Sequence, residues 1–329
     1  MKNDIVCPYC LEEDSIALRK DANNKKFYAC STCNSTIPRE YAENDSAEIE
    51  VISAVGFRGH GKTLYFSSLF YSLDKLATIW PGFYSFAGDE QSLDTLKENI
   101  SKLKKGELPP PNPASFPIPT NVRFSNMPGL GNRFFLFYDT GGEAYARASK
   151  LIKHAGFVKR SKTVIFIICL EDIDFDGMKM HELLSIYVQG LTELGGNPKN
   201  QNLLVVFSKG DLLGPKLAAW KHIRQYLAKG RLENLENLKL GNYMVGMKMV
   251  SARLKKFARK ELNAVQFLNF AHDQFKSVEF SIISSLGAKP VGGKLQVEIN
   301  PKCIFDPLLW AIFKSLNWFK KTFLLWKAR

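Results

Sequence analysis

The chain has 329 residues, of which 45% are hydrophobic and 23% charged, which excludes a disordered, collagen-like or coiled-coil protein. A net charge of +13 favours polyanionic partners such as nucleic acid or anionic lipid, and it carries no information about the fold. No apolar run reaches the roughly 20 residues of a membrane-spanning helix, and the first residues show no secretory signal. We therefore expect a cytoplasmic protein.

Two C-x-x-C pairs lie near the start of the chain, Cys7 with Cys10 and Cys30 with Cys33. This spacing is typical of a structural zinc site with four thiolate ligands. Short apolar segments between the pairs predict a small hairpin, so we expect a zinc ribbon and an acidic linker in residues 1–46, with the linker at residues 34–46. A redox dithiol is the alternative, but it needs one C-x-x-C in a thioredoxin-like surround. We expect zinc to fold the ribbon, and the linker to keep it separate from the rest of the chain.

A strand predicted at residues 51–55 runs into the sequence GFRGHGKT and then into a helical stretch. The pattern G-x-x-x-x-G-K-[ST] in this context predicts a phosphate-binding loop. Lys62 would reach the β- and γ-phosphates, and the Thr63 hydroxyl would bind magnesium. The loop residues that we expect to contact a nucleotide are Gly56, Gly59, His60, Gly61, Lys62 and Thr63.

Two further strands end in polar motifs. The strand predicted at 134–138 ends in DTGGE, where Asp139 is placed to hold magnesium through water and the N–H of Gly142 to meet a γ-phosphate. The strand predicted at 203–207 ends in Ser208-Lys209-Gly210-Asp211. The Asp211 carboxylate can accept hydrogen bonds from guanine N1–H and the amino group, which adenine does not offer, while the Lys209 stem lies along the base. Asp211 therefore favours GTP over ATP.

In this order, the three motifs resemble those of Ras-like GTPases of the translation-factor class, from about residue 50 to the C-terminus. The resemblance implies an α/β P-loop fold with a mostly parallel sheet and covering helices, which we place at residues 47–316. It also implies GTP/GDP and Mg²⁺ as ligands and slow, partner-regulated GTP hydrolysis by a molecular switch. One departure is Ser208, where the family prefers Asn or Thr; we expect the hydroxyl to keep part of the bracing role.

The same family uses a threonine on magnesium in its first switch. This threonine should precede the strand that pairs with residues 134–138, and we expect that partner strand at 122–125. Thr120 is then the candidate, with an ordinary turn residue after proline as the alternative reading. The preceding segment, residues 109–119, has six prolines and excludes regular helix or central strand.

Two segments compete for the small-residue loop that contacts guanine in the family. Ser251-Ala252 follows an apolar stretch at 245–250, which could be a strand. The segment Ser284, Ser285, Leu286 and Gly287 follows a more β-branched stretch at 278–283, and a helix fits between residues 255 and 275. We favour the second segment.

A finer resemblance is to bacterial double-GTPase-type proteins found in conflict and defence gene clusters. It depends on the Ser284–Gly287 segment, on Glu143 after the Asp139 motif and on the helix start DPLLW at 306–310. This resemblance implies a role in antiviral defence.

The candidate catalytic residues are Lys62, Glu143 and Arg58. Glu143 stands where the family often has a water-orienting Gln. Arg58, inside the phosphate loop, would act as an arginine finger in cis, or it is a plain solvent-facing residue. Arg147 is a further candidate arginine.

The C-terminal end, residues 317–329, is basic and aromatic. We expect Asp306 and Pro307 to begin a helix, with Asp306 as its N-cap. Beyond it, aromatic residues among cations predict contact with a protein partner or with an anionic membrane surface; these residues are Trp318, Phe319, Lys320, Lys321, Phe323, Leu324, Leu325, Trp326, Lys327 and Arg329. A protein effector or activator is therefore the expected partner, with peripheral membrane contact as a second possibility. A nucleic-acid-associated GTPase that uses the ribbon is the alternative function, and a nucleotide-binding scaffold that hardly hydrolyses is the third.

Overall fold

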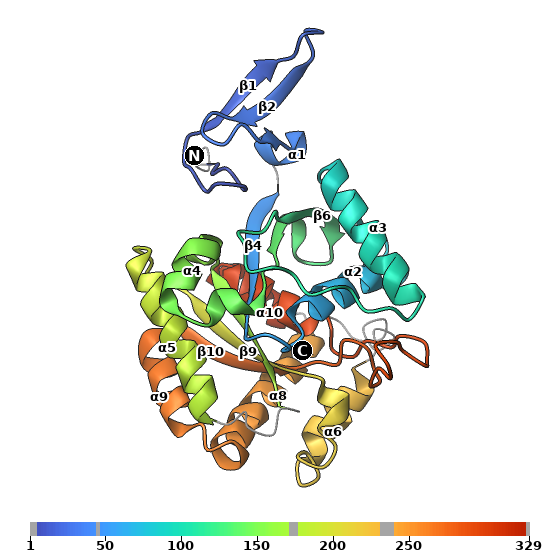
Figure 1. The fold of residues 1–329 in the computed structure, drawn as a ribbon. Coiled ribbons are helices and arrows are strands. Elements are labelled where there is room, and N and C mark those ends of the chain that lie inside the picture. Colours follow the sequence, from blue (N-terminus) through green and yellow to red (C-terminus); the bar gives the residue numbers. More distant parts are fainter. Residues whose placement is uncertain (1–4, 44–46, 171–176, 231–239, 327–329) are drawn as a thin grey trace.

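The structure, a computed structural model, describes residues 5–43, 47–170, 177–230 and 240–326, the last four by their backbone alone. A three-stranded antiparallel sheet near the N-terminus stands at one end of a larger sheet of seven strands (Figure 1). The strands of the small sheet are β1 (Ile16–Lys20), β2 (Lys26–Cys30) and β3 (Thr36–Ile37). β1 and β2 form the hairpin that the sequence predicts.

The segment that we expected to be a linker is largely structured. It contains β3 and the short helix α1 (Arg39–Ala42). Tyr41 of α1 is fully buried, and its ring lies 5.6 Å from that of Phe134 in the large sheet. The linker prediction is wrong for these residues because the apolar side chains in a polar-looking stretch pack on the neighbouring sheet; residues 44–46 lie outside the described part.

The large sheet has the order β10-β9-β8-β4-β7-β6-β5. It is parallel from β10 to β7 and antiparallel at β6 and β5. β8 and β9 are buried along their whole length, so helices cover both faces, as expected for parallel strands that read as continuous apolar runs. The strands are β4 (Glu48–Val55), β5 (Tyr84–Ala87), β6 (Thr120–Met127), β7 (Gly131–Tyr138), β8 (Thr163–Cys169), β9 (Asn202–Ser208) and β10 (Ser277–Ile282). The mostly parallel α/β fold predicted from the sequence is confirmed.

Helices alternate with these strands. α4, α5 and α9 pack together along one flank of the sheet, while α8 packs on β10 and α10 on β4, β8 and β9 (Figure 1). The α-helices of the large domain are α2 (Lys62–Ile79), α3 (Glu90–Lys104), α4 (Ala148–His154), α5 (Gly177–Glu193), α6 (Lys221–Lys229), α8 (Leu240–Glu261), α9 (Val265–Gln274), α10 (Asp306–Ser315) and α11 (Trp318–Trp326). Short 3-10 turns are η1 (Gly142–Tyr145), η2 (Gly156–Arg160), η3 (Pro198–Asn200) and η4 (Gly210–Leu212).

The stretch 245–250, considered as a strand, is part of helix α8. Met244, Met247, Val250 and Leu254 are buried at spacings of three and four residues, the period of a helix that packs by one face. The helix expected between 255 and 275 is two helices, α8 and α9. The stretch is apolar, as the sequence shows, but its buried residues repeat with the period of a helix and not with that of a strand.

Asp306 is the first residue of α10 rather than its N-cap, so that prediction is wrong. The side chain is buried and accepts hydrogen bonds from the hydroxyls of Tyr226 (2.7 Å) and Tyr243 (2.5 Å). Burial raises the pKa of its carboxyl to about 7. The helix ends at Ser315, and the separate helix α11 packs against α8. Among the described residues, no helix combines the length and apolarity needed to span a membrane.

Candidate functional site

The predicted phosphate loop connects β4 to α2. Gly59 and Gly61 have φ of 83° and 91°, in the left-handed region that glycine adopts without strain. At Gly56 a Cβ would lie 2.5 Å from the carbonyl oxygen of Ile167. The local geometry therefore requires the glycines of the motif, and the backbone of the loop leads directly into the N-terminus of α2.

Lys62 is buried, with 5% of its surface exposed. Its ammonium donates to the carbonyl oxygens of Gly56 (2.8 Å) and Phe57 (3.1 Å). Burial lowers its pKa to about 8, while the charges of Asp139 and Glu143 oppose that change. The cation is thus held over the loop by groups that an incoming phosphate can replace.

Asp139 directly follows β7, the neighbour of β4. Burial raises the pKa of its carboxyl to about 6, against the opposing charge of Lys62. Its Oδ2 accepts from Asn112 Nδ2 at 2.7 Å, and Oδ1 is buried with no hydrogen-bond partner among the described residues. Thr63, Thr120 and Asp139 line one cavity of about 410 Å³. The structure therefore brings together the three side chains predicted to surround magnesium.

The loop after Asp139 lies directly on the phosphate loop. A Cβ at Gly142 would overlap the backbone of Phe57 and Arg58. The predicted catalytic side chains Arg58 and Glu143 meet here, with 3.5 Å between Arg58 Nη1 and Glu143 Oε1. Arg147, the further candidate, precedes α4.

The proline-rich segment, residues 109–119, covers this site, a position that the sequence did not predict. The segment contains no regular element, as predicted. Its carbonyl oxygens accept hydrogen bonds from the Gly141 N–H (to Pro113, 3.0 Å) and the Thr140 hydroxyl (to Ser115, 2.8 Å). Together with the phosphate loop and Thr140–Glu143, the segment lines a second cavity, of about 460 Å³. In the sequence, Asn112 could have been identified by its position shortly before the strand of Thr120, because the family has its first switch in that region.

The residues predicted to bind guanine follow two adjacent parallel strands, β9 and β10. The Ser208 hydroxyl donates to the carbonyl oxygen of His60 in the phosphate loop at 2.8 Å, which is the bracing role expected of that position. Asp211 is half-buried in η4, and Lys209 has a φ of 52° just before it. The Gly210 N–H donates to Ile283 at 2.8 Å and so joins this motif to the loop after β10.

The two candidate guanine loops are separated by the structure. Ser284, Ser285 and Leu286 follow β10 beside the Ser208–Asp211 motif. Ser251 lies inside α8, where its hydroxyl contacts Glu279 Oε2 (2.8 Å) and the backbone N–H of Phe280 (2.8 Å). Ser251 therefore helps to dock α8 on β10, and only the second segment has the position of a nucleotide loop.

The family model for Double-GTPase 2 matches residues 50–246, more than half of the chain. The chain belongs to the Double-GTPase 2 family. It is accordingly a GTP-binding protein of a GTPase family, as the finer resemblance in its sequence implied. A search of curated proteins found no significant match.

Solved structures resemble this Double-GTPase 2 member at low identity. The Methanosarcina barkeri Roco2 RocCORdC structure bound to GDP is 13% identical, with a TM-score of 0.31 over 73% of this chain and 45% of that one. The S. cerevisiae Ski7 GTPase-like domain bound to GTP is 13% identical, with a TM-score of 0.36 over 86% and 54%. The chain thus spans about half the length of both. The Chaetomium thermophilum SRb-GTP/SRX complex of the signal recognition particle receptor is 15% identical, with a TM-score of 0.33 over 73% and 93%.

The Double-GTPase 2 site offers oxygen ligands that suit magnesium. A buried carboxylate oxygen of Asp139 without a protein partner is what a hard cation would satisfy, and Thr63 and Thr120 line the same cavity. Bound there, magnesium would neutralise charge between the β- and γ-phosphates. Thr63 and Asp139 are the residues that would hold it.

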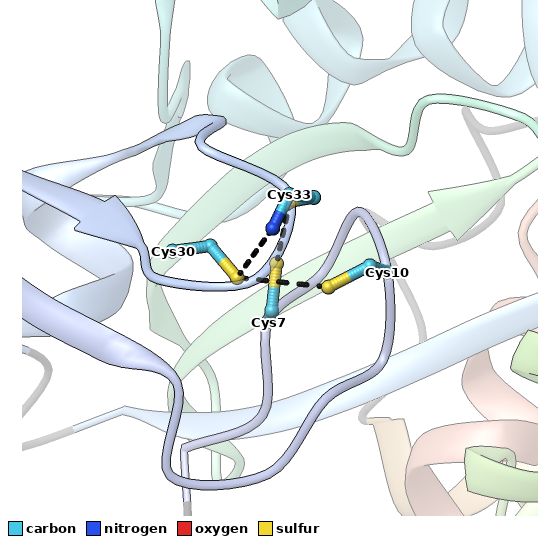
Figure 2. A group of neighbouring side chains, drawn as sticks. All are labelled: Cys7, Cys10, Cys30 and Cys33. Carbon is cyan, nitrogen blue, oxygen red and sulfur yellow. Dashed lines mark hydrogen bonds between the residues drawn. The ribbon is translucent and has the colours of Figure 1, made fainter.

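The four cysteines of this Double-GTPase 2 protein meet at the base of the small sheet (Figure 2). All four Sγ atoms lie within 4.8 Å of one another, with 3.8 Å between Cys7 and Cys33 and 3.6 Å between Cys10 and Cys30. A tetrahedral site with zinc–sulfur bonds of about 2.3 Å places sulfur atoms about 3.8 Å apart. The cluster therefore fits one zinc ion.

The environment of Cys30 favours a thiolate. Burial raises its pKa, but hydrogen bonds with the Ser15 hydroxyl and with the N–H groups of Cys33 (3.4 Å) and Thr32 (3.3 Å) outweigh burial and lower the pKa to about 6. Cys169 and Cys303, which we expected in the core, are buried elsewhere.

Proposed function

We propose that this protein is a GTP-driven switch that hydrolyses GTP slowly and whose turnover a protein partner accelerates. The observation that carries the proposal is the hydrogen bond of Asn112 to the carboxylate of Asp139. A magnesium ion bound with GTP would compete with the Asn112 amide for this carboxylate, so binding of GTP has to rearrange residues 109–119. A partner can then recognise the bound state by the position of this segment. A role of such a switch in antiviral defence stays a prediction from the sequence resemblance.

In this proposal hydrolysis depends on three side chains at the phosphate end. Lys62 binds the β- and γ-phosphates, Glu143 orients the attacking water and Arg58 stabilises the charge that develops. The Arg58 and Glu143 side chains are 76% and 40% exposed, so their ion pair is weak and can open when nucleotide enters. Both groups can therefore separate and turn toward the phosphates when nucleotide is bound.

Addition of GTP and magnesium is expected to change amide hydrogen exchange in residues 109–119 and 139–143, and GDP should not reproduce the change in full. Lys62→Ala should abolish GTP binding and this response, because the variant loses the ammonium that is held at the loop carbonyls of Gly56 and Phe57. Lys75→Ala, an exposed lysine on the same helix, should keep both.

Phosphate release in the same samples tests hydrolysis. Arg58→Ala and Glu143→Gln should each lower it by about tenfold or more while GTP still binds. The same exchange pattern with GTP, with GDP and without nucleotide would contradict the switch. GTP binding without phosphate release, even with cellular partners added, would mean a nucleotide-binding scaffold.

A second candidate function, a nucleic-acid-associated GTPase, is favoured by the tip of the β1–β2 hairpin. Lys20 lies directly opposite Lys26 in the strand register, and Arg19 and Lys25 flank this pair. Like charges in directly opposite positions destabilise a strand pair, so a bound polyanion would relieve the repulsion between these two lysines. Asp21, the acid in this turn, accepts hydrogen bonds from two backbone N–H groups. The hairpin projects from the body of the molecule, so these cations suit a phosphate backbone (Figure 1).

Replacing Lys20 and Lys26 together by Gln should weaken binding to single-stranded RNA and lower the salt slope of the affinity by about 1.4. The exposed pair Lys104 and Lys105 provides a matched control with the same change in charge. Equal losses for both pairs would mean non-specific attraction to the net charge of +13 and would reject the hairpin as the contact.

A contact with anionic membranes is the alternative outcome, and it depends on α11. Trp318 and Phe319 are 69% and 76% exposed. Lys320 pairs with Glu48 at 3.1 Å, which leaves the two rings as the main described basis for such a contact. Lys321 is half-buried and donates to the carbonyl oxygen of Lys314 at 3.1 Å. The remaining residues of that prediction, Phe323, Leu324, Leu325, Trp326, Lys327 and Arg329, lie outside the described side chains. Co-sedimentation with phosphatidylserine vesicles that is lost in the Trp318→Ala/Phe319→Ala variant would support the membrane over RNA.

A further inference from the structure

The cysteine cluster is tied to the large sheet through one buried hydrogen bond. The hydroxyl of Tyr138 donates to the carbonyl oxygen of Pro8 at 2.6 Å. Pro8 stands between Cys7 and Cys10, inside the turn that supplies half of the thiolates. Tyr138 is fully buried, so its hydroxyl depends on this turn for its acceptor.

Tyr138 also lies next to the predicted magnesium ligand. It is the last residue of β7, and Asp139 follows it directly. Its ring stacks on that of Phe157, with centroids 4.5 Å apart and planes 5° apart. Phe116 of the proline-rich segment packs edge-on against both rings, at 6.2 Å from Tyr138 and 5.8 Å from Phe157. One side chain therefore contacts the cysteine turn, the covering segment and the backbone that carries Asp139.

These contacts suggest a direct physical dependence between two sites. Four thiolates gathered around a cation fix the path of the Pro8 carbonyl, and without the cation the turn has little core of its own to hold it. If the turn moves, the hydrogen bond that anchors the Tyr138 ring at the end of β7 is lost, and the ring is free to shift. The position of Asp139 changes with it, since the two residues share a peptide bond.

We propose that Tyr138 is a positioning residue that makes the placement of Asp139, and so the affinity for magnesium and nucleotide, depend on a filled four-cysteine site. This inference rests on the proposed function, because it assumes that Asp139 serves a nucleotide-bound magnesium ion. In this proposal the ribbon positions a residue of the nucleotide site in the same chain, in addition to any contact that its hairpin makes with another molecule.

The test compares Tyr138→Phe with Tyr41→Phe. The second variant is the matched control: the Tyr41 hydroxyl donates to the Val6 carbonyl oxygen, also at 2.6 Å, in the same ribbon, but Tyr41 lies in α1, away from the nucleotide motifs. The measured quantity is the Mg²⁺ concentration that gives half-maximal binding of a fluorescent GDP analogue. It is measured for zinc-loaded protein and after treatment with a zinc-selective chelator, and zinc content is measured in each sample.

We expect zinc removal to raise the Mg²⁺ midpoint of the wild type by about fivefold or more, the effect of one lost buried hydrogen bond. Tyr138→Phe should show the raised midpoint with zinc still bound and little further change on chelation, while Tyr41→Phe should behave as wild type. A wild-type midpoint in zinc-loaded Tyr138→Phe, or equal shifts in both variants, would overturn the proposal.

Amide hydrogen exchange separates this failure from failure of the proposed function. If zinc-loaded wild type binds no guanine nucleotide, the proposed function is wrong. Residues 138–143 should still exchange faster after zinc removal in the wild type if Tyr138 links the two sites, and unchanged exchange there would overturn the link itself.

Discussion

The Asp211→Asn variant is expected to bind GTP about tenfold to a hundredfold more weakly than the wild type and to gain affinity for xanthosine triphosphate. The carboxylate can accept two hydrogen bonds from the guanine edge, and a bidentate pair of this kind discriminates by about 1–3 kcal/mol. An amide presents a donor in place of one acceptor, which suits the carbonyl oxygen of xanthine. Asp211 is half-buried at the end of β9 beside the Ser284-Ser285 loop, so water compensates only in part.

Competition titrations with GTP, XTP and ATP measure this change in specificity. Asp74→Asn, an exposed carboxylate on α2, is the control for the loss of one negative charge and should leave all three affinities unchanged. Wild-type protein that binds ATP as tightly as GTP would show that the assignment of residues 208–211 to guanine is wrong.

The second large effect is expected from Cys30→Ser, which should remove zinc and destabilise the whole chain. If the ribbon were a separate unit, as we expected from the sequence, such a variant would unfold the ribbon and spare the GTPase domain. The structure contradicts this independence, because Tyr41 is fully buried against Phe134 and the Tyr138 hydroxyl bonds to Pro8. Loss of the metal therefore exposes apolar surface and a polar group of the large domain.

Elemental analysis and calorimetry test this coupling. We expect about one zinc ion per chain in the wild type and none in the variant. The main unfolding transition of the variant should occur several degrees lower, since about 1 kcal/mol corresponds to roughly 2–4 °C in a domain of this size. Thr32 is exposed and lies between the ligands Cys30 and Cys33, so Thr32→Ala should retain both the zinc ion and the transition temperature. If the main transition of zinc-free Cys30→Ser were unchanged, the ribbon and the GTPase domain would be independent units.

Local sequence patterns were sufficient for the phosphate loop, the two later strand-end motifs and the four cysteines. Each of these features depends on neighbouring residues. Glycines permit the left-handed conformations at Gly59 and Gly61, and a lysine begins the next helix. In each C-x-x-C pair, two intervening residues allow both thiols to bind one metal ion. The alternation of strands and helices along the chain then implied a mostly parallel sheet with covering helices, because such elements have few ways to pack.

Features that depend on distant residues were decided by the tertiary structure. Residues 245–250 are apolar enough for a strand, yet they are helical because one face of α8 is buried and Ser251 docks on β10. Asp306 is a good N-cap by residue type, but two tyrosines from other helices hold it in the core.

The same limit applies to the site. The sequence was enough to predict which residues would carry the chemistry of phosphate, guanine and metal binding, since this information is local. Three contacts join segments that are 27, 85 and 130 residues apart: Asn112 with Asp139, Arg58 with Glu143, and Tyr138 with Pro8 of the ribbon. Such contacts are set by how the β-sheet brings strand ends together, and only the folded chain defines them.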